Sequence, residues 1–255
     1  MPSQVTFDLS EQTAFITGAT SGFGARFAEV LSDAGAHVVI TGRRVERLHA
    51  LRDKIAAKGG RATPLAIDVT SVAGIRACVS AAEKAVGPIS ILVNNAGLNV
   101  QSSAAALSER DYDTLMNTNV KGAFFVAQAV GARMIEQRIE GRIVNIASIG
   151  AFKALPGLVA YSMSKAAVAM MTKGLAREWA KHHIAVNAIC PGFIETELND
   201  EWFKTEGGQK QIAGFPRKRI GRSEDLDATL LLLCSRHASF ITGSLFTVDD
   251  GQLLA

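Results

Sequence analysis

Two side chains four residues apart suggest acid-base chemistry. Tyr161 and Lys165 stand in the run Tyr-Ser-Met-Ser-Lys, and on a helix residues at this spacing share a face. A phenol ionises near pH 10, whereas a group that moves protons in carbonyl chemistry should titrate nearer the working pH. An ammonium about 5 Å away, at an effective dielectric near 20, favours the phenolate by on the order of 3 kcal/mol, roughly two pKa units. The pair therefore predicts a tyrosine that donates and accepts a proton.

A serine is placed to assist this tyrosine. Ser148 follows the β-branched run Arg142 to Ala147, which we predict to be a strand. Ligands of open parallel sheets bind at the carboxyl ends of the strands, so the Ser148 hydroxyl is expected to hold a substrate oxygen beside the phenol. A serine after a strand is usually a turn residue, so this prediction depends on Tyr161.

A glycine-rich turn could hold a phosphate group. It joins a predicted strand at Thr13 to Thr17 with a predicted helix at Gly22 to Asp33. Glycines permit a tight turn and close backbone approach, and the N–H groups at a helix start attract a pyrophosphate. The spacing G-x-x-x-G-x-G differs from the common G-x-G-x-x-G fingerprint, but its position between strand and helix favours a dinucleotide site over a structural turn. The turn reads Gly18-Ala19-Thr20-Ser21-Gly22-Phe23-Gly24.

The end of the second predicted strand indicates which dinucleotide binds. Dinucleotide folds hold the adenosine ribose with a carboxylate at this point, whereas a nearby arginine accommodates a 2′-phosphate. Here Gly42 takes the carboxylate position, and Arg43 and Arg44 follow. A 2′-phosphate would meet no like charge and could gain charge-assisted hydrogen bonds of roughly 1.5–3 kcal/mol each. We predict a preference for NADP(H) over NAD(H); solvated charges beside a helix are the alternative interpretation.

Short strand-like runs alternate with longer helical stretches along the whole chain. This alternation is typical of a parallel sheet covered on both faces, and no linker or repeat interrupts it. We predict one α/β domain over residues 1–255, a Rossmann-type doubly wound parallel sheet with helices on both faces. The irregular stretch at about residues 193–222 is expected to be a mobile substrate flap. The other expected elements are strands at 37–41, 62–67, 89–94, 142–147, 184–189 and 245–248, and helices at 45–58, 72–86, 108–136 and 161–182.

Composition argues against several classes of partner. The formal net charge of +3 offers no electrostatic basis for nucleic-acid binding. With 48% hydrophobic and 20% charged residues, the chain should form a sizeable core. No apolar run approaches the ~18 residues of a membrane span, and the N-terminus does not resemble a secretion signal. The three cysteines lie far apart and favour neither a metal site nor a disulfide framework. We expect a cytoplasmic protein without a bound metal.

Two predicted helical segments are apolar on more sides than one sheet can cover. Residues 120–135 contain a run of valine, alanine and phenylalanine, and residues 166–171 are wholly apolar. The surplus face needs a partner, unless small alanines are simply tolerated at the surface. We therefore predict a homo-oligomer, with a tetramer as the expected state.

Together these motifs resemble the short-chain dehydrogenase/reductase family, most closely its compact single-domain branch. The resemblance runs from Asp8 to Gly251, nearly the whole chain. It implies an oxidoreductase that transfers a hydride between a nicotinamide cofactor and a small-molecule carbonyl or alcohol. The residues that carry it, in order, are Gly18/Gly22/Gly24, Asn94-Asn95-Ala96-Gly97, Asn119 in Asn-Thr-Asn-Val-Lys-Gly, Ser148, Tyr161, Lys165 and Pro191-Gly192.

The resemblance also implies a role for each matching residue. Tyr161 would protonate the carbonyl oxygen during reduction and take the proton back during oxidation, while Ser148 orients that oxygen. Asn119 would join a water molecule and Lys165 in a proton relay to Tyr161, and Lys165 would also touch the ribose. The turn glycines would approach the pyrophosphate. The implied cofactor-binding residues are Gly18, Thr20, Ser21, Gly22, Phe23, Gly24, Arg43, Arg44, Asp68 and Val69 at the adenine, Asn95, Ala96 and Gly97 at the ribose, Tyr161, Lys165, and Pro191, Gly192, Ile194 and Thr196 at the carboxamide.

Two positions depart from the family pattern. Phe23 stands where a smaller aliphatic residue is usual, which could crowd the nucleotide entrance. Asp250 replaces the usual first glycine of a Gly-Gly pair near the C-terminus, which puts the local packing there in question. Neither position belongs to the acid-base set.

The substrate side carries weaker signals. Its candidate residues are mostly apolar, as small-molecule sites commonly are, which favours an apolar or aromatic ketone and its secondary alcohol. A 3-oxoacyl-thioester reductase is an alternative, because Arg138 and Arg177 resemble arginines that family members use toward an acidic carrier. A catalytically silent NADP-binding regulator on the same fold is another. The predicted substrate residues are Ser148, Ile149, Leu155, Tyr161, Phe193, Leu198 and Trp202.

Overall fold

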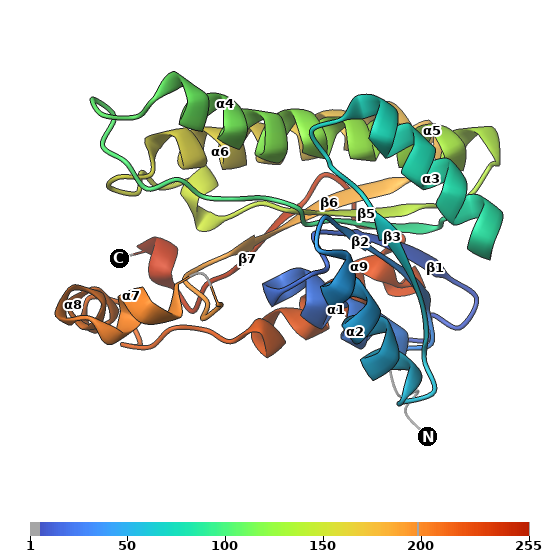
Figure 1. Ribbon diagram of the computed structural model, residues 1–255, viewed down its shortest axis with the longest axis horizontal. Coiled ribbons are helices and arrows are strands. Elements are labelled where there is room, and N and C mark those ends of the chain that lie inside the picture. Colours follow the sequence, from blue (N-terminus) through green and yellow to red (C-terminus); the bar gives the residue numbers. More distant parts are fainter. Residues whose placement is uncertain (1–5, 198, 255) are drawn as a thin grey trace.

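The computed structural model describes residues 6–197 and 199–254, and it has the predicted doubly wound α/β fold (Figure 1). One parallel sheet has the strand order β3-β2-β1-β4-β5-β6-β7. The order reverses between β1 and β4, and ligands of such sheets bind at the carboxyl ends of the strands beside this point. The strands are β1 (Thr13–Thr17), β2 (His37–Gly42), β3 (Arg61–Ala66), β4 (Ile91–Asn94), β5 (Arg142–Ile146), β6 (Ala185–Pro191) and β7 (Leu245–Val248).

Helices cover both faces of the sheet (Figure 1). On one face α1, α2 and α9 bury a core that includes Phe27 and Leu230. On the other face α3, α5 and α6 bury Val79, Val130 and Leu175, and α4 lies over α6. Their bounds are α1 (Gly22–Asp33), α2 (Val45–Ala56), α3 (Val72–Val86), α4 (Glu109–Met116), α5 (Ala123–Glu136), α6 (Val159–Trp179) and α9 (Asp227–Cys234).

Two helical features differ from the sequence prediction. The block expected at residues 108–136 is interrupted by a π-helical turn at Asn117–Gly122, where a Cβ on Gly122 would lie 2.8 Å from the Val69 carbonyl oxygen. Such turns often occur at functional sites. Helix α9 was not predicted, because its sequence DATLLLLC shows no amphipathic period. The reason is tertiary: α9 contacts α1 on one side and β5 on another, so several of its faces are covered.

The segment expected to be irregular, residues 193–222, contains two short helices, α7 (Asp200–Lys204) and α8 (Glu206–Ala213). Gly207 and Gly208 lie inside α8 rather than in a loop, because they permit close packing. A Cβ on Gly208 would lie 2.1 Å from the Trp202 carbonyl oxygen. The segment also has its own aromatic cluster, in which Phe193 stacks on Phe215 at 5.3 Å between ring centroids.

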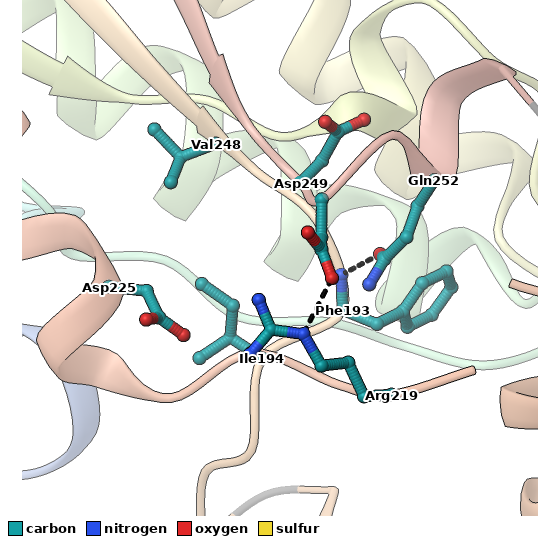
Figure 2. A pocket seen from close by; sticks show the side chains of 9 residues that line it. Phe193, Ile194, Arg219, Asp225, Val248, Asp249 and Gln252 are labelled. Carbon is teal, nitrogen blue, oxygen red and sulfur yellow. Dashed lines mark hydrogen bonds and ion pairs between the residues drawn. The ribbon is translucent and has the colours of Figure 1, made fainter. Parts of the chain in front are cut away.

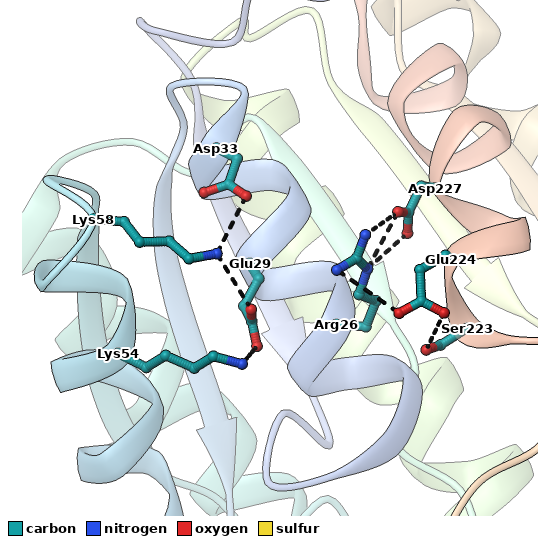
Figure 3. A network of polar contacts seen from close by, with 8 residues as sticks. All are labelled: Arg26, Glu29, Asp33, Lys54, Lys58, Ser223, Glu224 and Asp227. Atoms are coloured by element: carbon teal, nitrogen blue, oxygen red, sulfur yellow. Dashed lines mark hydrogen bonds and ion pairs between the residues drawn. The ribbon is translucent and has the colours of Figure 1, made fainter.

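Ion pairs fix α1, which begins at the glycine-rich turn, between two neighbouring helices (Figure 3). On one side Arg26 pairs with Asp227 at the start of α9 and lies 3.9 Å from Glu224. On the other side Glu29 accepts from Lys54 of α2 at 2.6 Å, and its side chain is 11% exposed. These contacts set the position of α1 relative to the strands whose ends form the candidate site. Within the described parts of the chain, no helix combines the length and apolar character needed to cross a bilayer.

Candidate active site

The glycine-rich turn lies at the carboxyl end of β1, close to the end of β4. Gly18 has φ +69°, and a Cβ there would lie 2.9 Å from the Ala96 Cα. A Cβ on Gly24 would lie 2.2 Å from the Gly18 carbonyl oxygen. Residue 18 therefore requires glycine for its backbone angle and its close neighbour, and residue 24 requires it for its close neighbours alone. The structure brings the turn together with Asn95 and Ala96, as the prediction of a shared nucleotide site requires.

Thr17 organises this junction and was missed by sequence reasoning. Its buried hydroxyl oxygen accepts hydrogen bonds from the backbone N–H of Asn95 at 3.0 Å and of Ala96 at 2.9 Å. The Asn95 side chain donates in return to the Thr17 carbonyl oxygen at 2.9 Å. Asn95 therefore serves at least as a tie between β4 and the turn. The available signal was a polar residue at the end of an otherwise apolar strand, beside the turn.

The start of α1 fits the phosphate groups of a dinucleotide. Gly22 has φ +53°, and a Cβ there would meet nothing within 4 Å, so open space lies beside the turn. Ser21 makes no side-chain capping bond to α1, and the first turn contains no acidic residue. Helix N–H groups and the helix dipole favour an anion in such a place. Phe23 is partly buried and stacks on Phe27 at 6.0 Å between centroids, which directs it toward the core.

Arg44 lies across the glycine-rich turn. Its guanidinium donates to the hydroxyl oxygens of Thr20, at 2.6 and 3.1 Å, and of Ser21, at 2.7 Å. Gly42 is packed beneath Thr20, because a Cβ there would lie 2.6 Å from the Thr20 Cγ2. Arg44, one of the two arginines predicted to hold a 2′-phosphate, therefore lies against the predicted pyrophosphate residues.

The residues predicted to border the adenine lie beyond β3. The Asp68 carboxylate accepts from the backbone N–H and hydroxyl of Thr70, at 2.9 and 2.8 Å. These bonds, and more weakly the charge of Arg43, lower the pKa of Asp68. Val69 is buried under the π-helical turn, with its carbonyl oxygen against Gly122. Arg43 is exposed and lies toward Asp68, whereas Arg44 contacts the glycine-rich turn.

The four predicted catalytic residues come from three segments of one face. Ser148 follows β5 and is 8% exposed; its side chain lies beside the Tyr161 phenol on α6, and its oxygen accepts from the Gly150 N–H at 3.0 Å. Lys165 is buried one helical turn later, and its Nζ lies 5.7 Å from the centroid of the Tyr161 ring. The serine–tyrosine contact gives two polar atoms that can hold one substrate oxygen.

Asn119 is buried in the π-helical turn and uses its amide to join two segments. Its Oδ1 accepts from the Leu98 N–H, and its Nδ2 donates to the Leu98 carbonyl oxygen, both at 2.8 Å. Its Nδ2 also lies 3.1 Å from the Ser164 hydroxyl oxygen. A Cβ on Gly97 would lie 3.3 Å from Asn119 Oδ1 and 3.6 Å from Lys165 Nζ, so these two side chains converge on Gly97. The direct hydrogen bonds of the Asn119 side chain thus go to Leu98 and Ser164.

The electrostatics of the pair differ from the sequence expectation. Burial raises the pKa of Tyr161, and the Ser148 hydrogen bond opposes this only in part. Burial also lowers the pKa of Lys165 from 10.5 to about 8. The ammonium lies over the ring and donates to the Ile146 carbonyl oxygen at 2.8 Å. The expected acidification of Tyr161 by Lys165 is therefore wrong: desolvation raises the pKa of the phenol, and it outweighs the opposing effect of Ser148.

The predicted carboxamide residues follow β6. A Cβ on Gly192 would lie 2.5 Å from Gln252 Oε1, which also accepts from the Phe193 N–H at 2.6 Å. Ile194 is buried, and the Thr196 N–H donates to Asn199 Oδ1 at 2.8 Å. Gln252, absent from the predicted cofactor site, therefore shapes the backbone after Pro191. A side chain so distant in sequence gave no local signal.

The predicted substrate residues come from two parts of the chain, the segment after β5 and the segment after β6. Ile149 is buried beside Ser148, and a Cβ on Gly150 would lie 3.3 Å from Leu155 Cδ1. Trp202 is 46% exposed on α7, with its indole N–H donating to Gln211 at 2.9 Å. Leu198 lies outside the described residues. Of the predicted substrate residues, Phe193 borders a polar cavity of about 240 Å³ (Figure 2). The cavity is lined by Phe193, Ile194, Arg219, Gly221, Asp225, Val248, Asp249, Asp250 and Gln252.

The chain belongs to the short-chain dehydrogenase/reductase family, because the family model for short chain dehydrogenases matches residues 12–207. It is 38% identical over 246 residues to a gluconate 5-dehydrogenase of Gluconobacter oxydans, with 96% of each chain covered. It is also 38% identical over 245 residues to a 3-oxoacyl-[acyl-carrier-protein] reductase of Aquifex aeolicus, covering 96% of this chain and 98% of the relative.

A solved structure has the same architecture. It is a gluconate 5-dehydrogenase of Burkholderia cenocepacia in complex with NADP and tartrate, with a TM-score of 0.94, 35% identity and 98% of each chain covered. The chain described here is therefore an oxidoreductase of this family.

Proposed function

We propose that the protein interconverts a ketone and a secondary alcohol with NADP(H), using Tyr161 as the general acid and base. The placement of the Ser148 side chain beside the Tyr161 phenol, at the carboxyl edge of the sheet, carries this proposal. It forms a place for one substrate oxygen, with Lys165 buried next to it and open space at the glycine-rich turn. The name and ligand of the Burkholderia structure support the same chemistry.

The nicotinamide, when bound, supplies or accepts the hydride at the carbonyl carbon. Ser148 and Tyr161 would hold the carbonyl oxygen between their hydroxyl groups. In reduction the phenol O–H breaks and its proton goes to that oxygen; in oxidation the phenol oxygen takes the proton back. Because burial raises its pKa, Tyr161 is protonated at neutral pH, the form needed for reduction. Lys165, with a pKa of about 8, can exchange a proton close to the working pH.

We infer that NADP(H) is preferred because two exposed arginines adjoin the nucleotide end of the site. Arg44 already contacts two hydroxyl groups of the turn, which are additional donors for a phosphate. Arg44→Gln is expected to lower kcat/KM for NADPH about tenfold or more, the equivalent of one charge-assisted bond, and to change that for NADH less. Arg52→Gln, which removes a partly exposed arginine of α2, is the control. Equal losses with both cofactors would contradict the preference.

The substrate class remains our proposal of a ketone and its secondary alcohol, and a hydroxylated acid is included because relatives are gluconate 5-dehydrogenases. Reduction of a 3-oxoacyl thioester is a second candidate, supported by the Aquifex relative. The exposed Arg138 and Arg177 give it less support, because both lie at the far ends of helices. Arg138 follows α5, and Arg177 lies in the last turn of α6. Arg177 is 16 residues beyond Tyr161 on α6, about 24 Å at 1.5 Å per residue.

We also infer a homo-oligomer, and a tetramer as its form. The sequence predicts surplus apolar faces on two helical segments. In these segments Phe124 is 37% exposed and Met170 is 67% exposed. An apolar groove beside them is lined by Met116, Asn117, Val120, Lys121, Phe124 and Met171. Light scattering at micromolar concentration should give a multiple of the 27.0 kDa chain mass, and a monomer would contradict the inference.

A panel of carbonyls and alcohols tests the activity, with NADPH or NADH absorbance as the readout. The panel should contain gluconate, an aromatic ketone and a 3-oxoacyl thioester. Tyr161→Phe should lower kcat by about 10²–10⁴-fold while NADPH still binds. The only other tyrosine, Tyr112, is 36% exposed on α4, and Tyr112→Phe should keep full activity. An active Tyr161→Phe variant would contradict the proposed mechanism, and NADPH binding without turnover of any panel member would favour a regulator.

A further inference from the structure

The turn that follows β7 is attached to both arms of the segment after β6. We call residues 249–252 the C-terminal turn, and residues 193–197 and 199–222 the flap. On the returning arm Arg217 Nη1 and Arg219 Nε donate to the two carboxylate oxygens of Asp250, at 3.0 and 2.7 Å. On the outgoing arm the Phe193 N–H donates to Gln252 Oε1 at 2.6 Å (Figure 2).

The two arms of the flap also pair with each other at a neck, which we define as residues 193–195 and 221. The Gly221 N–H donates to the Phe193 carbonyl oxygen, and the Glu195 N–H donates to the Gly221 carbonyl oxygen, both at 3.0 Å. The C-terminal turn thus holds the backbone that bears the proposed carboxamide residues. The 240 Å³ cavity is lined by the neck, the returning arm and the C-terminal turn together.

The backbone on both sides of the ionic contact adopts a conformation that favours glycine. Asp250 has φ +52°, and Lys218, between the two arginines, has φ +50°. Such angles cost free energy for residues with a side chain, although aspartate tolerates them better than most. A glycine at residue 250, usual in the resembled family pattern, would avoid this cost. Aspartate instead supplies a carboxylate that pairs with both arginines. Its side chain is only 19% exposed.

We propose that Asp250 is a positioning residue, an ionic catch that acts through Arg217 and Arg219 to hold the neck closed, and with it the backbone of the proposed carboxamide residue Ile194. This inference rests on the proposed function for its catalytic consequence but not for the catch itself. The arginine side chains are 68% and 53% exposed, so solvent and salt screen the contact and the catch is weak enough to open during turnover. Loss of the catch should increase opening of the neck without unfolding the sheet.

Hydrogen exchange of the cofactor-free protein, followed by mass spectrometry, tests the catch directly. Asp250→Asn keeps the size of the side chain and removes its charge, and we expect peptides containing Glu195 and Gly221 to exchange about tenfold faster. Peptides from β1 to β5 should be unchanged. Arg217→Gln combined with Arg219→Gln should have the same effect as Asp250→Asn. Salt at 0.5 M should accelerate neck exchange in the native chain but not further in Asp250→Asn.

Two further variants separate charge from backbone strain and from general effects on the flap. Asp250→Gly removes the charge but favours the backbone angle, so faster neck exchange with unchanged or higher thermal stability is expected. Lys204→Gln removes ion pairs to Asp200 and Glu201 inside α7, and it should leave neck exchange unchanged. Neck exchange that is the same in Asp250→Asn as in the native chain would overturn the catch.

Kinetics then test the consequence for catalysis. With the best substrate of the panel, Asp250→Asn should raise KM for substrate several-fold and accelerate NADPH release, with a smaller change in kcat. Faster neck exchange with unchanged KM and unchanged release would overturn the positioning role. If no panel member were turned over, the proposed function would fail while NADPH release and neck exchange would still decide the catch.

Discussion

Lys165→Met should make the cofactor-free protein more stable while it removes activity. A pKa lowered from 10.5 to about 8 means that keeping this buried ammonium charged at neutral pH costs on the order of 3 kcal/mol. Methionine has a similar length and removes that cost, but it also loses the 2.8 Å hydrogen bond to the Ile146 carbonyl oxygen, about 1 kcal/mol. The net gain should be about 2 kcal/mol, or about 4–8 °C in Tm for a chain of this size.

The pH dependence of this gain checks its cause. The pKa of Lys165 is lower in the folded state, so between about pH 8 and 10.5 the unfolded chain binds more protons and native stability rises with pH. The penalty is complete below pH 8 and disappears above 10.5, so the advantage of Lys165→Met should shrink over this window. Differential scanning calorimetry of cofactor-free protein at pH 7, 9 and 10 measures it.

An exposed lysine on the same helix provides the control. Lys173→Met on α6 removes one lysine without a buried charge and should change stability by no more than about 0.5 kcal/mol at each pH. A Lys165→Met variant with unchanged or lower Tm at pH 7, or an advantage that does not depend on pH, would refute the reasoning that burial of the ammonium is costly.

Three other changes should have measurable effects. Gly24→Ala places a Cβ 2.2 Å from the Gly18 carbonyl oxygen and should abolish NADPH binding or folding, whereas Gly174→Ala on α6 meets nothing and should stabilise by about 0.5–1 kcal/mol in thermal unfolding. Thr17→Val removes the acceptor of two backbone N–H groups and should destabilise by about 2–4 kcal/mol in urea unfolding; a loss below 1 kcal/mol would show that water replaces the hydroxyl. Because burial raises the pKa of Tyr161, the initial rate of reduction should stay level through neutral pH and fall only at strongly alkaline pH, while oxidation accelerates with pH; a reduction rate that falls between pH 6 and 8 would contradict this assignment.

The sequence was most informative where chemistry or geometry is local. Gly18 and Gly24 follow a strand and begin a helix, and the structure shows the close contacts that exclude a side chain there. Tyr161 and Lys165 lie on one helix, so their spacing alone placed them one turn apart. The alternation of strand and helix predicted the parallel sheet, because a helix that connects two neighbouring strands returns the chain to run in the same direction.

Tertiary contacts decided the features that depend on residues far apart in the chain. Thr17 and Asn95 tie two strands together, and Gln252 shapes the backbone after β6 from 59 residues away. Helices α7, α8 and α9 were not predicted, because α7 has only five residues, α8 contains two glycines, and α9 is apolar on several sides. The pKa of Tyr161 moved opposite to expectation, because spacing gives the distance to Lys165 but not how deeply both groups are buried. Burial is a property of the whole packed fold, and so the sequence could identify the proposed acid and its neighbour, while their pKa shifts depend on the tertiary structure.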